Sequence, residues 1–131
     1  MQYLTEGDIL AFYREVIGAP VVRFPEGLAA AVLAPQQIMR GPDDYVALMR
    51  GTAALISAMT KHRPFVHGNR RAAWICGKLF LQLHGYTVCA SDAEVLELLT
   101  RSMTNAVTPE ALADWIDHHV SCFTPVEYSR P

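Results

Sequence analysis

The residues best suited to chemistry lie together in residues 62–73, which read HRPFVHGNRRAA. A long amphipathic pattern follows Gly68, so we expect a helix to begin at or near Asn69. The first N–H groups of a helix lack internal partners, and the helix dipole adds about half a positive charge there. Arg70 and Arg71 in the first turn oppose that dipole. Their presence predicts a bound anion, and phosphate suits such a site best.

Composition limits the class of protein. With 131 residues, 51% hydrophobic and 18% charged, the chain suits one globular domain over residues 1–131. A net charge of -2 argues against direct nucleic-acid binding, so any contact with a polyanion must be local. No signal-peptide pattern or membrane-length apolar run is present. Three widely spaced cysteines without a CxxC pair suit a reducing compartment, so we expect a cytoplasmic protein.

The apolar spacing is helical nearly throughout, which predicts an all-α domain of about six helices around a central helix. Thr5 with Asp8, and Ser91 with Glu94, have the spacing of capping boxes at two helix starts. We expect Pro35 to end the second helix, because proline cannot continue the hydrogen-bond ladder. The expected helices span about 6–17, 25–34, 41–61, 69–84, 92–104 and 109–122.

Val21 and Val22 suit a short strand, and Tyr45 has the spacing of a buried residue of the third helix. The fourth helix has a wide apolar stripe, which predicts a central position. The tail, residues 124–131, is expected to be frayed.

The loop and the helix after it resemble the Fic/Doc (Fido) family. Its motif is His-x-Phe-x-(Asp/Glu/Asn)-(Gly/Ala)-Asn-(Gly/Lys)-Arg. Phe65 takes the phenylalanine place as an apolar anchor, and the run Gly68, Asn69, Arg70 and Arg71 takes the last four places. The stretches AAWICGKLFLQLHGYTV and GAPVVRFPEGLAAAV and the chain length also look like Doc-type, death-on-curing members. The resemblance implies a Fido domain whose Gly68-to-Arg71 turn holds nucleotide phosphates.

Two positions depart from this motif. Arg63 stands at the place of the histidine that the family uses as general base on a target hydroxyl. His67 stands at the place of the acidic residue that holds Mg²⁺ on the nucleotide. Arginine stays protonated at neutral pH, and Mg²⁺ prefers oxygen ligands to imidazole. The resemblance thus implies ATP or another nucleotide together with Mg²⁺, whereas these residues argue against both the base and the metal ligand.

His62, Arg63 and His67 are the candidates for altered catalytic roles. His62 lies one residue before the motif place, and side chains alternate in direction along an extended loop. It therefore acts as a base only if the loop shifts; otherwise it is a surface histidine. His67 lies beside the phosphate turn and, when protonated, would donate to an anion. Two histidines five residues apart without cysteine or carboxylate partners are a weak metal signal, so we assign no metal.

Three functions remain open. The first, implied by the resemblance, is a Doc-like toxin that transfers a phosphoryl or nucleotidyl group to a protein hydroxyl, with chemistry altered by Arg63 and His67. Its implied partners are a target like translation elongation factor Tu and an antitoxin peptide. The bulky cation Arg70 favours the phosphate placement of the Doc kinase, which has lysine there. The second is a catalytically inactive Fido protein that binds phosphate or a partner. The third is a Fido scaffold reassigned to a small-molecule biosynthetic reaction.

Overall fold

The computed structural model describes residues 3–38 and 45–122. Within these ranges the chain forms six helices and two short strands, which confirms the predicted all-α class. The expected start of the third helix at 41–43 and the tail at 124–131 lie outside the described residues. The elements are α1 Glu6–Val16, α2 Pro25–Ile38, α3 Tyr45–His62, α4 Asn69–Leu83, β1 Tyr86–Val88, α5 Asp92–Met103, α6 Pro109–His119 and β2 Val120–Cys122.

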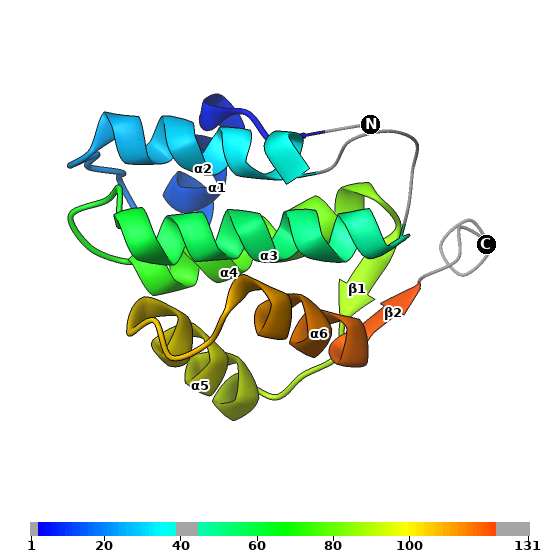
Figure 1. Ribbon diagram of the computed structural model, residues 1–131. Helices are drawn as coiled ribbons and strands as arrows, with labels where there is room; N and C mark the ends of the chain where they lie inside the picture. Colours follow the sequence, from blue (N-terminus) through cyan, green and yellow to red (C-terminus); the bar gives the residue numbers. More distant parts are fainter. Residues whose placement is uncertain (1–2, 39–44, 123–131) are drawn as a thin grey trace, which may run out of the picture.

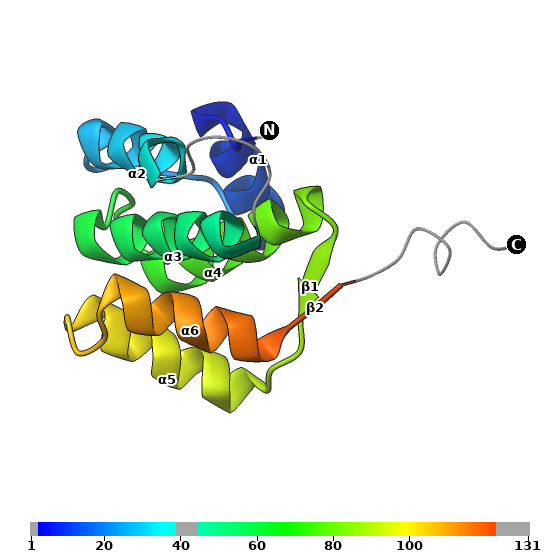
Figure 2. The same cartoon turned by 45° about the vertical axis from the view of Figure 1, so that its right-hand side comes forward.

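The helices are arranged in three layers (Figures 1 and 2). α1 and α2 form one outer layer, α3 and α4 the middle layer, and α5 and α6 the other outer layer. α3 packs against α2, α4, α5 and α6, and α4 packs against α1, α3 and α5. The fourth helix, expected at the centre, therefore shares that position with α3. No helix in the described part of the chain combines the length and hydropathy that a membrane crossing requires.

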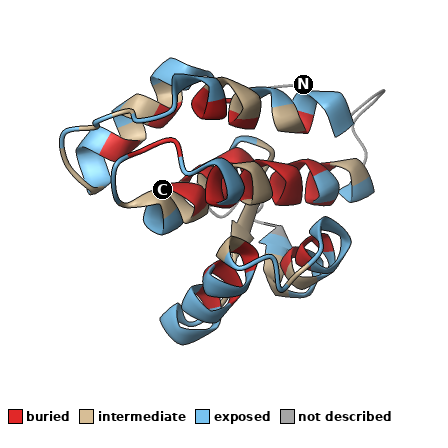
Figure 3. Ribbon diagram, turned by 60° about the vertical axis from the view of Figure 1, so that its left-hand side comes forward, coloured by how far each residue is buried: buried red, intermediate tan, exposed pale blue. Residues whose placement is uncertain are grey.

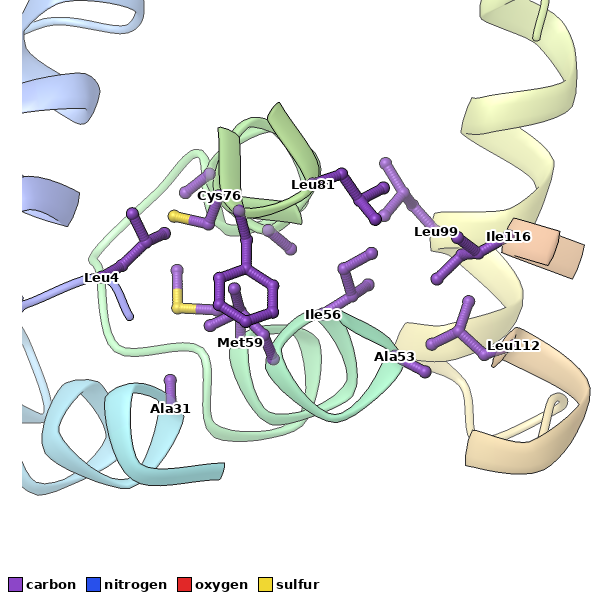
Figure 4. Close-up of a cluster of buried hydrophobic side chains, with 14 of the residues drawn as sticks. Leu4, Ala31, Ala53, Ile56, Met59, Cys76, Leu81, Leu99, Leu112 and Ile116 are labelled. Atoms are coloured by element: carbon purple, nitrogen blue, oxygen red, sulfur yellow. The ribbon is translucent and has the colours of Figure 1, made fainter. Parts of the chain in front are cut away.

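One hydrophobic core joins the three layers. Figure 3 shows buried residues concentrated along the inner helix faces, and Figure 4 shows side chains from all three layers around the middle helices. α3 and α4 approach closely because residue 77 is glycine. A Cβ atom at Gly77 would lie 2.6 Å from Cδ1 of Ile56.

Local signals set most helix ends. Both predicted capping boxes are confirmed, with Thr5 accepting from Asp8 N–H and Ser91 accepting from Glu94 N–H. The prediction for Pro35 was wrong, because α2 continues to Ile38 with the proline inside it. Pro35 is buried and stands in the last turn. Packing of its ring there can offset the one helical hydrogen bond that proline removes.

Two further expectations were wrong near the other end of the bundle. α6 stops at His119 instead of residue 122, because Val120–Cys122 pairs antiparallel with β1 and satisfies the backbone by a strand partner. Tyr45 is 39% exposed instead of buried. Its hydroxyl donates to Oδ1 of Asp117 at 2.5 Å, which links α3 to α6 at the surface. Partial burial, followed by the contact with Asp117, raises the pKa of Tyr45 to about 12.

The capping box of α5 predicts a measurable acid sensitivity. Hydrogen bonds from the Ser91 backbone and side chain, followed by one with His119, lower the pKa of Glu94 below its usual 4.5. A lowered pKa means that the unfolded chain binds the proton more readily, so stability present above pH about 4.5 is lost as the pH falls further. In Glu94→Gln, glutamine keeps the capping geometry without titrating. We expect Tm to fall less between pH 5 and 3 in Glu94→Gln than in the wild type.

Thermal melts by circular dichroism check this expectation. Glu97→Gln, which changes an exposed carboxylate of the same helix outside the capping box, is the control and should follow the wild type. Equal acid slopes for Glu94→Gln and Glu97→Gln would contradict the prediction.

Candidate functional site

The loop between α3 and α4 is held by the segment that precedes α2. The N–H groups of Arg23 and Phe24 both donate to the carbonyl oxygen of Pro64, at 2.7 and 3.0 Å. Val22 pairs with Phe65 in an isolated antiparallel bridge. The short strand expected at residues 21–22 is thus a single bridge, and it places Arg23 beside the loop.

Phe65 and Asn69 fix the loop from inside. The Phe65 side chain is fully buried and stacks on Tyr13, with ring centroids 4.3 Å apart. The Asn69 side chain accepts from Phe65 N–H through Oδ1 and donates to Phe65 O through Nδ2, both at 2.9 Å. Asn69 therefore clamps the backbone on both sides of Phe65, and its amide is occupied by the loop.

The start of α4 lies at Asn69, as predicted. Gly68 is the N-cap residue, with φ +77, a conformation that favours glycine. A Cβ atom there would approach the Tyr13 hydroxyl to 3.2 Å. No side chain of the described residues caps this helix. Free N–H groups at its first turn are therefore available to a ligand.

Four arginines surround this helix start. A pocket of about 400 Å³ lies there. Its lining comes from the start of α4, the α1–α2 loop, the α3–α4 loop and the end of α5. These loops and the end of α5 lie at the same end of the bundle (Figure 1). The lining of the pocket contains no acidic side chain. The residues that line it are Arg23, Arg63, Val66, Gly68, Asn69, Arg70, Arg71 and Met103.

Three of these arginines are held by single hydrogen bonds to neighbouring helices. Arg63 donates to the carbonyl of Met103 at 3.2 Å, and its φ of +46 is unusual for a residue other than glycine. Arg70 donates to Thr100 Oγ1, and Arg71 donates to the carbonyl of Val16, each at 3.4 Å.

These bonds leave most of the guanidinium donors free. Each guanidinium has five N–H groups, so one bond leaves several donors for a ligand. Within residues 3–38 and 45–122, none of the four pocket arginines forms an ion pair with a carboxylate.

The two histidines do not line this pocket. His62 is the exposed last residue of α3, and its Cβ lies 2.9 Å from the position that a Cβ on Gly27 would take. It therefore packs toward α2. His67 is also exposed, and its Nδ1 lies 3.4 Å from the Tyr13 hydroxyl, which donates to the His67 carbonyl at 2.7 Å. Of the three residues singled out for altered catalysis, the structure places Arg63 alone in the pocket lining.

The donor set of the pocket does not fit Mg²⁺. Mg²⁺ is held in proteins by carboxylate oxygens and water. The lining offers one side-chain oxygen, Oδ1 of Asn69, and that atom already accepts from Phe65 N–H. More widely, the described residues contain no group of three or more His, Cys, Asp or Glu side chains placed to hold a metal ion. Phosphate oxygens, in contrast, match guanidinium donors and free helix N–H groups.

Sequence reasoning missed three residues of the pocket: Arg23, Val66 and Met103. Arg23 stands some forty positions before the motif arginines, in a stretch that reads as an apolar segment, VVRFP. Its one local signal was a lone cation before Pro25. Met103 lines the pocket because it is the last residue of α5 and its carbonyl accepts a hydrogen bond from Arg63. Val66 is part of the loop itself, whereas no sequence spacing links Arg23 or Met103 to the loop, so only folding brings these two residues to the pocket.

Comparison with known proteins shows the family of the chain. The model of the Fic/DOC family matches residues 3–81, which include α1 to α3, the whole loop between α3 and α4, and α4 as far as Leu81. The chain is also similar to Toxin Doc of Mycolicibacterium smegmatis, at 33% identity over 90 residues, which cover 68% of this chain and 69% of that protein. With more than half of its length matched by the family model and a relative at this identity, the protein belongs to the Fic/Doc family.

Proposed function

We propose that the protein is a Doc-like toxin that holds the phosphates of a nucleotide, ATP in the first instance, in the arginine pocket. It transfers a phosphoryl or nucleotidyl group to a protein hydroxyl at a strongly reduced rate. The observation that supports this most is the set of four arginines around the uncapped start of α4, without acidic residues in the lining. Such an arrangement is suited to a polyphosphate.

The reduced rate follows from the positions of the histidines. His62 packs toward α2 and His67 lies against Tyr13, so neither is among the residues that line the pocket. Arg63 remains protonated at neutral pH and cannot accept the proton of a target hydroxyl. Loss of a general base typically lowers a rate by about 10²–10⁴-fold.

Kinase-like transfer to a translation elongation factor Tu-like protein in the cytoplasm is the version we favour. The similarity to a protein named Toxin Doc supports it, as does the cation at position 70, where the Doc kinase has lysine. The experiment is incubation with radiolabelled ATP and purified elongation factor Tu at high concentration of this protein. Slow label transfer is expected, well above a sample without the protein.

Arg71→Ala is expected to weaken nucleotide binding. Loss of one or two charge-assisted hydrogen bonds costs about 1.5–3 kcal/mol each, so the dissociation constant should rise about 10-fold or more. Isothermal titration calorimetry measures it, with Arg14→Ala as a control that removes an exposed arginine of α1 outside the pocket. Equal affinities for the two variants would refute phosphate binding at the start of α4.

A catalytically inactive phosphate-binding protein is the second candidate, and the position of both histidines outside the pocket favours it. It predicts the same loss of affinity in Arg71→Ala. It differs in predicting no label transfer at any enzyme concentration. The transfer assay therefore separates the two candidates.

The proposed partner of a surface that adjoins the arginine pocket is an antitoxin peptide. Two adjoining apolar pockets of about 330 and 410 Å³ share Val16 and Ile75 and form a groove over α4, between α1 and α5. Val16 and Leu96 along it are half exposed, as expected for a surface covered by a partner. A small neighbouring gene whose product co-purifies with this chain is the expected finding. Loss of that product in Leu96→Glu would place it in the groove.

A further inference from the structure

We infer that the arginine pocket binds its phosphate ligand as the free anion, without Mg²⁺, and that Arg63 supplies positive charge that a divalent cation would otherwise bring. This inference rests on the proposed function, because it specifies the form in which that same pocket takes the nucleotide. It starts from a mismatch between the family's Mg²⁺ and the side chains of this pocket.

The pocket has a positive charge that no neighbouring carboxylate in the described part of the chain neutralises. Four arginines line a volume of about 400 Å³, and no carboxylate of the described residues pairs with any of them. A divalent cation brought into this volume would be repelled by all four groups, and no carboxylate of the lining would hold it. Free ATP carries more negative charge than its Mg²⁺ complex, so the same groups attract the free form more strongly.

Arg63 is held at the pocket by its backbone conformation and by the end of α5. The residue adopts φ +46, a conformation that is sterically unfavourable for a side chain other than glycine. Its guanidinium donates to the carbonyl of Met103, the last residue of α5, where the negative end of the helix dipole favours a cation. One of its five donors is thus used to hold it, and the others remain for a ligand. Arg63 is therefore an anion-binding group held in place before the ligand arrives.

Position 67 differs from the family motif in a way that complements the change at position 63. His67, which stands where the family has its metal-holding residue, is held at Tyr13 and does not line the pocket. One cationic residue has entered the pocket lining, and the residue at the metal position lies outside it. Both changes act in the same direction, toward a ligand that brings no cation of its own.

Calorimetric titration of the wild-type protein with ATP in two buffers, one with EDTA and one with excess MgCl₂, tests the inference. We expect the affinity in EDTA to equal or exceed that in MgCl₂. Binding in MgCl₂ with none in EDTA would overturn the inference and leave the proposed function standing. Absence of binding in both buffers would overturn the proposed function, and this inference with it.

Three variants identify the residue responsible. Arg63→Gln should weaken binding in EDTA about 10-fold, the effect of one charge-assisted hydrogen bond. Arg63→Lys keeps the positive charge but loses the planar, bidentate arrangement of the guanidinium donors, so it should weaken binding less than Arg63→Gln does. Arg14→Gln removes the same charge outside the pocket and should bind as the wild type does. Equal affinities for folded Arg63→Gln and Arg14→Gln would overturn the role of Arg63. If circular dichroism shows that Arg63→Gln does not fold, Arg63→Ala takes its place. An affinity of folded Arg63→Ala equal to that of the wild type would then overturn the role of Arg63.

Discussion

Phe65→Ala is expected to lower the free energy of unfolding by about 3–5 kcal/mol, the usual cost of truncating a fully buried phenylalanine. Phe65 has no exposed surface and stacks on Tyr13 of α1. Its backbone is also the part of the loop that Asn69 clamps. The cavity left by the ring would therefore lie between the first layer and the loop that carries the candidate site.

Val66→Ala is the matched control, since the neighbouring side chain is 51% exposed. Its change should remain within about 0.5 kcal/mol. Urea unfolding followed by circular dichroism gives both free energies, with unchanged slopes indicating that two-state unfolding is retained. A loss below about 1 kcal/mol in Phe65→Ala would mean that the loop is held by its backbone bonds and not by the ring.

Arg63→His is expected to increase group transfer from ATP to the target hydroxyl by about 10²-fold, the lower end of what a general base contributes. Arg63 is the one residue of the three catalytic candidates that lines the pocket, so an imidazole there can reach a substrate that His62 and His67 do not. The gain should disappear as the pH falls below about 6.5, where imidazole is protonated. Radiolabel transfer at saturating ATP measures it, because the variant also loses a phosphate-binding cation.

Arg63→Gln separates the base from the charge. Glutamine removes the same positive charge but cannot accept a proton as a general base. If Arg63→Gln and Arg63→His raise the rate equally, charge and not proton transfer limits the reaction. If neither raises it, the second candidate, binding without turnover, is the better description of the protein.

Much of the backbone could be predicted from the sequence. The start of α4 at Asn69, its end before Gly85 and both capping boxes lie where the sequence placed them. These features depend on residues within about four positions of each other, because a cap satisfies N–H groups of the first turn. Expectations that required knowledge of a distant partner were the ones that proved wrong. α2 continues through the buried Pro35, and residues 120–122 leave α6 to pair with β1.

The candidate site also has a part that follows from local sequence and a part that depends on distant residues. The sequence by itself determined a helix that begins with Gly68 and Asn69, carries Arg70 and Arg71 in its first turn, and follows an unusual Arg63. Tertiary structure decided which of the charged and titratable side chains meet. It brought Arg23 into the pocket and turned His67 to Tyr13, 54 positions away in the chain. The physical reason is that caps and backbone preferences act over a single helical turn, whereas the direction of a loop side chain depends on which distant residue offers it a partner.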